Sequence, residues 1–109
     1  MPSINFEQYF KTLESGVSDV AKETVSDFMS QGKQDGQNVL NLMKADLERW
    51  TIEVSNGEMS LSDFEFLVKA EKELDEMDAL KEAGIAAIDL DKFKNGLISL
   101  TINTLSKLL

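Results

Sequence analysis

Carboxylates are the side chains of this sequence that offer the most chemistry. The 109 residues include twenty Asp and Glu against eleven Lys and Arg, and they contain neither histidine nor cysteine. Paired carboxylates can transfer protons or hold a hard divalent cation through their oxygens. Without imidazole or thiol groups there is no Ser-His-Asp or Cys-His catalysis, no HExxH zinc site and no disulfide. Because no spacing selects one pair of carboxylates for acid–base work, we expect no enzyme activity and no cofactor.

The acidic side chains are concentrated between Ser62 and Glu82. This segment has eight Asp and Glu and three Lys, and so carries more than half of the net charge of −9. Four of its carboxylates recur at three- and four-residue spacing on one side of a helix, namely Glu71, Asp75, Asp78 and Glu82. Such a face could dock a basic protein, as small acidic inhibitors do, or hold a divalent metal weakly. The structural alternative is a solvated outer face supported by ion pairs such as Lys69 with Glu73.

A shorter segment, residues 55–64, has the glycine and oxygen spacing of a calcium loop. Gly57, Ser60 and Asp63 stand at the sixth, ninth and twelfth positions, so the segment resembles the second half of an EF-hand loop. Counting back, Ile52 and Val54 occupy positions where calcium needs oxygen ligands. We therefore expect a capped turn between two helices here, with no calcium site.

The C-terminal residues 89–109 predict a helix with a large apolar surface. At about 100° per residue, one apolar stripe consists of Phe93, Leu97, Leu100 and Leu108. A second stripe, roughly 130° away around the same helix, consists of Ile98, Ile102, Leu105 and Leu109. The remaining face is small and uncharged apart from Lys107. Because the first stripe suffices to join a bundle, the second is our candidate interface for self-association, with a dimer favoured. Packing on a neighbouring helix of the same chain is the alternative.

Helical spacing of apolar residues recurs along almost the whole chain, without the sustained alternation that is typical of strands. The first helix is expected to begin after Ser3 or Asn5, both good N-caps. Its apolar seam consists of Phe6, Phe10, Leu13, Val17, Val20, Thr24 and Phe28. The seam of the second helix consists of Leu40, Met43, Leu47, Trp50 and Val54. Residues 31–37 contain two glycines and no large apolar side chain, so we predict a turn there.

An alternative for the N-terminal half is one unbroken helix over residues 4–55. Gly32 and Gly36 continue the apolar spacing from one seam to the next, where they would permit close approach of another helix. Such a helix would be roughly 78 Å long, which is too long for a compact monomer of this size. Two shorter helices would then complete the fold by dimerisation.

Glycines mark two further breaks. Residues 56–57 end the second helix, and either Ser60 or Ser62 caps the third. The third helix is expected to continue to residue 83, with Gly84 as its left-handed terminal residue and Asp89 as the N-cap of the fourth. Residues 1–109 are therefore expected to form one all-α domain, an antiparallel up-down four-helix bundle.

Two polar residues interrupt the apolar seams: Thr24 in the first and Asp46, beside Trp50, in the second. Both are candidates for a buried functional group. The structural alternatives are that Thr24 bonds the backbone of its own helix and that Asp46 lies at the edge of its stripe. Trp50 is the only tryptophan and is expected in the core.

The net charge of −9 disfavours nucleic acids and membrane surfaces as partners. No apolar run reaches the ~18 to 20 residues of a membrane span, and Met1–Asn5 lacks the regions of a signal peptide, so we expect a cytoplasmic protein. The sequence predicts a non-enzymatic helical interaction module that self-associates through its C-terminal helix. The alternatives are an acidic inhibitor or adaptor of a basic protein, and a weak carboxylate metal binder.

Overall fold

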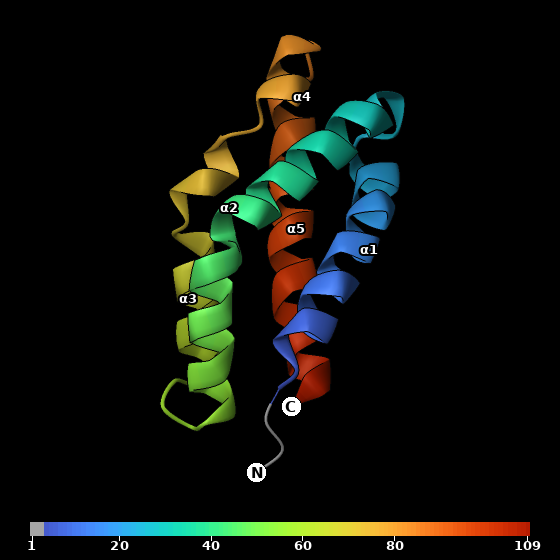
Figure 1. Ribbon diagram of the computed structural model, residues 1–109. Helices are drawn as coiled ribbons and strands as arrows, with labels where there is room; N and C mark the ends of the chain where they lie inside the picture. The colour runs from blue at the N-terminus through green and yellow to red at the C-terminus, as the bar shows by residue number, and fades with distance from the viewer. Residues whose placement is uncertain (1–3) are drawn as a thin grey trace.

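The computed structural model describes residues 4–109, and within this range every regular element is a helix (Figure 1). The elements are α1 (Phe6–Thr24), η1 (Ser26–Phe28), α2 (Met29–Ser55), α3 (Leu61–Lys69), η2 (Lys72–Asp75), α4 (Asp78–Glu82) and α5 (Ala87–Leu108), where η denotes a 3-10 helix. The all-α prediction is confirmed, whereas the four-helix topology is not. No helix in this range is long and apolar enough to cross a membrane.

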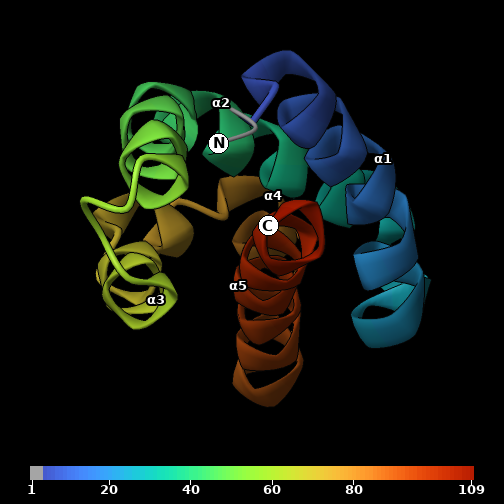
Figure 2. The same ribbon diagram turned by 90° about the horizontal axis from the view of Figure 1, so that it is seen from below.

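Three helices are arranged around α5. Seen from below, α1, α2 and α3 form an arc around α5, and all three contact it (Figure 2). α1 runs antiparallel to α5, and α2 crosses diagonally before its second half lies beside α3 (Figure 1). Side chains from these four helices fill the core, among them Leu13, Leu47, Phe64, Phe93 and Leu105. The buried Tyr9 also donates its hydroxyl to the backbone oxygen of Thr101 at 2.9 Å, which joins α1 to α5.

The chain reverses between α1 and α2 at residues 25–28, before the predicted turn at residues 31–37. Val25 and Phe28 leave the helical region, with φ of −134° and −133°. Gly32 and Gly36 lie inside α2 and are buried. A Cβ on Gly36 would lie 2.5 Å from Cγ1 of Val17, and one on Gly32 would lie 2.8 Å from Cγ2 of Val25.

The predicted turn at residues 31–37 is therefore wrong, because these glycines serve close helix packing instead of chain reversal. Close packing is the role that the long-helix alternative assigned to them. The unbroken helix over residues 4–55 is wrong as well, since α2 folds back along α1. The general lesson is that glycine at a helix spacing can mark a contact surface as readily as a turn.

Two of the predicted N-caps are confirmed. The side chain of Asn5 accepts a hydrogen bond from the backbone nitrogen of Gln8 at 3.2 Å. The alternative cap, Ser3, lies outside the described residues. Ser60 accepts from the backbone nitrogen of Asp63 at 3.0 Å, so the earlier of the two candidate serines caps α3. Both short polar side chains thus satisfy an N–H group of a first helical turn.

The predicted third helix, extending to residue 83, is wrong, because the chain forms α3, η2 and α4 in its place. The physical reason lies on α2, where the buried carboxylate of Asp35 faces the start of α4. It accepts hydrogen bonds from the backbone nitrogens of Ala79 at 3.1 Å and Leu80 at 2.8 Å. Because a helix N-terminus presents unsatisfied N–H groups and a partial positive charge, this carboxylate stabilises a new helix start. The apolar spacing survives the break, since the chain still buries Leu74, Met77 and Leu80.

The two glycine turns are confirmed. Gly57 and Gly84 have φ of +78° and +84°, the left-handed region that side chains with a Cβ rarely adopt. Each glycine follows a helix end that is closed by the two backbone hydrogen bonds of a Schellman motif. α5 then begins at Ala87, so the predicted cap Asp89 lies in its first turn, where a negative charge favours the helix dipole.

Candidate functional site

The second apolar stripe of α5 is mostly covered within the chain. Ile98 and Leu105 are buried, and Ile102 is partly buried against the core. Leu109, at the end of this stripe, is 61% exposed, and Leu108, from the first stripe, is 42% exposed. α1 and α3 pack on either side of α5 (Figure 2). The exposed apolar surface of the stripe is therefore its C-terminal end.

A groove between α1 and α5 begins at this end. It has a volume of about 460 Å³ and is lined by Thr12, Ser15, Gly16, Asp19, Leu100, Thr104, Lys107 and Leu108. Leu100 can lie against α1 because Gly16 has no side chain, and a Cβ there would be 2.5 Å from Cδ1 of Leu100. The lining of the groove thus combines two leucines with small polar residues and two charged ones.

The two charged residues of this groove have opposite signs and lie towards opposite ends. Val20 of α1 packs directly on Gly96 of α5, where a Cβ would be 2.6 Å from Cγ1 of Val20. In this antiparallel register Asp19 is level with the end of the groove that is farther from the C-terminus of α5. Lys107 lies about ten residues further along α5, which corresponds to roughly 15 Å along the axis. Both side chains are exposed.

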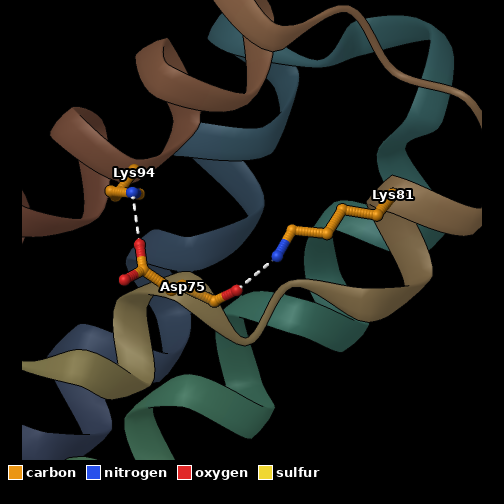
Figure 3. A network of polar contacts seen from close by, with 3 residues as sticks. All are labelled: Asp75, Lys81 and Lys94. Atoms are coloured by element: carbon orange, nitrogen blue, oxygen red, sulfur yellow. Dashed lines mark hydrogen bonds and ion pairs between the residues drawn. The ribbon is translucent and has the colours of Figure 1, made fainter.

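The four carboxylates predicted to form one acidic face lie in three parts of the chain with different surroundings. Asp75, at the end of η2, forms an ion pair with Lys94 of α5 at 2.7 Å, and its backbone oxygen accepts from Nζ of Lys81 at 2.6 Å (Figure 3). The hydrogen bond from Lys94 holds the pKa of the Asp75 carboxyl below its usual value. Asp75 therefore helps to attach η2 and α4 to the rest of the chain.

Asp78 and Glu82 form a second, separate acidic group on α4. They line a polar hollow of about 380 Å³ together with Asp35, Gln34 and Asn38 of α2. The carboxylate of Asp35 already accepts the hydrogen bonds that cap α4, whereas Asp78 and Glu82 are exposed. This hollow therefore presents two carboxylates of the predicted acidic face to solvent.

Glu71 belongs to a third group, at the joint between α3 and η2. Its Oε1 atom is buried and has no hydrogen-bond partner among the described residues. Burial, followed by hydrogen bonds to the carboxylates of Glu73 and Asp46 and by their negative charges, raises the pKa of Glu71 to about 8. The hydrogen bond from Glu71 lowers the pKa of Glu73 in turn. Glu71 therefore keeps its proton to near neutral pH, with the carboxylates of Glu73 and Asp46 as its neighbours.

The carboxyl cluster of Asp46, Glu71 and Glu73 was only partly foreseen. Asp46 is the polar seam residue that the sequence marked, and the structure places it against Glu71 of the next segment. The sequence pattern places Glu71 on the acidic face, and it indicates Glu73 only as an ion-pair partner of Lys69. The sequence feature that indicates this cluster is Asp46 itself, because it is an acidic residue on an apolar seam beside Trp50.

The remaining marked residues have structural surroundings. Thr24 donates its hydroxyl to the backbone oxygen of Val20 in its own helix at 2.6 Å, as predicted. Trp50 is buried and packs edge-on against Phe64, with ring centroids 6.5 Å apart. Within residues 4–109, no three acidic side chains are arranged to hold a metal ion.

No family model, curated protein or solved structure matches this chain. Three surfaces of the chain itself remain as indications of its function. The α1–α5 groove offers an apolar surface with charges at both ends. The α4 hollow offers carboxylates, and the α3–η2 joint offers a carboxyl group, that of Glu71, whose pKa is raised to about 8.

Proposed function

We propose that this chain is a non-enzymatic helical interaction module that associates with a second copy of itself through the α1–α5 groove. The observation that carries the proposal is the placement of Asp19 and Lys107. A two-fold axis across the middle of the groove would bring Asp19 of each copy over Lys107 of the other, because the two residues lie towards opposite ends. Symmetric dimers require such a self-complementary surface.

The apolar part of the contact comes from leucines near Lys107. Leu108 and Leu109 are both substantially exposed, and the partly buried Leu100 also lines the groove. Burying such side chains contributes about 1.5 to 3 kcal/mol each, whereas an exposed ion pair contributes only about 0.2 to 1 kcal/mol. The leucines would therefore supply most of the affinity, and the charges would set the orientation.

The net charge of −9 on each copy opposes association. Moderate salt screens this overall repulsion and also weakens the two exposed ion pairs. Because the leucine contacts do not depend on charge, the proposed dimer should persist in salt. A small contact surface of this kind is typical of a weak dimer.

Light scattering coupled to size-exclusion chromatography tests the proposal. We expect a concentration-dependent rise of the wild-type mass above the 12.2 kDa of one chain. Leu108→Asp should abolish this rise. Leu42→Asp is the matched control, because Leu42 is similarly exposed, at 48%, but lies on α2 outside the groove. A wild-type mass of one chain at millimolar concentration would refute self-association.

A basic protein is the second candidate partner, and the hollow on α4 is the observation that favours it. Its carboxylates, Asp78 and Glu82, face the same space, and its lining includes no Lys or Arg among the described residues. A basic partner bound there should be released by about 0.5 M salt, since screening weakens exposed charge pairs. Asp78→Asn with Glu82→Gln should abolish such binding and leave the mass of the chain alone unchanged.

A further inference from the structure

Glu71 lies where the chain changes direction between α3 and η2. α3 ends at Lys69, and Glu71 adopts an extended backbone with φ of −66° and ψ of 122° before η2 begins. Its backbone N–H still donates to the oxygen of Val68 at 3.1 Å, so the bend is sharp. Whatever holds the Glu71 side chain on α2 therefore sets the direction in which η2 and α4 continue.

Glu71 lines a hollow of about 300 Å³ beside the joint. The other residues that line it are Trp50 of α2, Leu67 of α3, Ala70, and Lys72 and Glu73 of η2. The charged groups that act on Glu71 are Asp46 of α2 and Glu73 of η2, both negative.

Positive charges close to this cluster are engaged with its other members. Arg49 pairs with Asp46 at 3.2 Å and also lies over the Trp50 ring. Lys72 is exposed and acts on Glu73. With one proton, Glu71 can donate to a neighbouring carboxylate, whereas without it three negative charges would face one another beside an oxygen that has no partner.

We propose that the Asp46–Glu71–Glu73 cluster is a proton-operated latch, in which the proton on the Glu71 carboxyl holds the α3–η2 joint against α2 and its loss releases the joint. This is a conformational device within the fold, independent of the groove between α1 and α5. Two other contacts keep α4 attached when the joint opens: the Asp35 cap and the Asp75–Lys94 ion pair. The opening is therefore local to the joint.

The direction of the pH dependence follows from the pKa of Glu71. The pKa is about 8 in the closed joint and near its ordinary value of 4.5 when the side chain is released to water. Between these values opening releases a proton, so the contribution of Glu71 to stability is full below about pH 4.5 and declines as pH rises. The opening constant should increase by up to about tenfold per pH unit and level off above about pH 8, where the closed joint also ionises.

Amide hydrogen exchange measured by NMR, corrected for intrinsic rates, tests the latch. The reporters are the backbone N–H groups of Glu71, Leu74 and Glu76, which donate to Val68, Glu71 and Glu73. In the wild type, their opening constants should rise between pH 6 and 8 and level off above. Glu71→Gln, which has no proton to lose, should show no slope. Glu76→Gln removes an exposed carboxylate of the same segment and should keep the wild-type slope.

Asp46→Asn keeps the test decisive if Glu71→Gln disturbs folding. Removing this negative neighbour should lower the pKa of Glu71, so the levelling-off point should move below pH 8. A wild-type opening constant that is flat from pH 6 to 8 would overturn the proposal. A slope that persists in Glu71→Gln, or a levelling-off point that Asp46→Asn leaves in place, would overturn it as well.

Discussion

Two regions of this chain use similar apolar spacing and hold together in different ways. The body, consisting of α1, α2 and α5, packs long helices at contacts that only glycine permits, at Gly16, Gly32, Gly36 and Gly96. The arm, residues 61–86, consists of short helices that bury side chains such as Phe64 and Leu80 in the same core. Its short helices are also tied to the body by polar contacts, among them the Asp35 cap and the Asp75–Lys94 pair. Apolar spacing therefore identifies a buried face, whereas the continuity of a helix depends on contacts with residues that are distant in the sequence.

The largest expected effect belongs to the body. Gly36→Leu should lower the free energy of unfolding by about 3 kcal/mol, because its Cβ alone would already lie 2.5 Å from the stiff side chain of Val17. Denaturant unfolding followed by circular dichroism measures this loss. Lys33→Leu, at an exposed position of the same helix, is the control and should change stability little. Equal stability of the two variants would contradict the view that close packing at glycine holds the body together.

The next effect belongs to the arm. Asp35→Ala leaves two backbone N–H groups of α4 without their acceptor and should cost about 2 kcal/mol. The loss should appear first as faster hydrogen exchange at Ala79 and Leu80, with α1 and α5 still protected. Asp35→Asn retains an acceptor oxygen and should have a smaller effect. Uniform loss of protection over the whole chain would show that body and arm unfold as one unit.

The smallest effect belongs to the ion pair between the two regions. Lys94→Gln removes the hydrogen bond that holds the pKa of Asp75 below its usual value, so this pKa should rise towards that value. In the wild type the pair contributes stability at neutral pH, and this contribution is lost as pH falls through the lowered pKa of Asp75. An NMR titration of the Asp75 carboxyl measures the change. An unchanged Asp75 pKa would mean that Lys94 and Asp75 do not form this ion pair in solution.

Much of the fold could be predicted because local chemistry decides it. The caps at Asn5 and Ser60 and the left-handed Gly57 and Gly84 each depend on a few neighbouring residues. The spacing of the seams also identified most of the buried residues. These features need no knowledge of the tertiary structure.

The errors occur where residues distant in sequence decide the outcome. Gly36 favours a turn on local grounds, and only the approach of Val17 explains its place inside a helix. Residues 70–77 favour a helix on local grounds, and the cap that starts α4 comes from Asp35, more than forty residues earlier.

The candidate sites show the same division. The exposed end of α5 could be predicted from its excess of leucine and isoleucine, although Ile98 and Leu105 are covered by the chain itself. The pairing of Asp46 with Glu71 could not, because it depends on the bend after α3.

Self-association through the body is tested most directly by exchanging the charges of its groove. Asp19→Lys alone and Lys107→Glu alone should each associate less than the wild type, because like charges would then meet across the two-fold axis. In an equimolar mixture of the two variants, each Lys at position 19 would face a Glu at position 107, and each Asp19 would face a Lys107. We expect light scattering to give a mass near twice 12.2 kDa for the mixture at a concentration where each variant alone remains a monomer. Glu23→Lys, outside the groove on α1, should fail to replace Asp19→Lys in this mixture. A mixture that stays monomeric while the wild type dimerises would contradict the proposed interface.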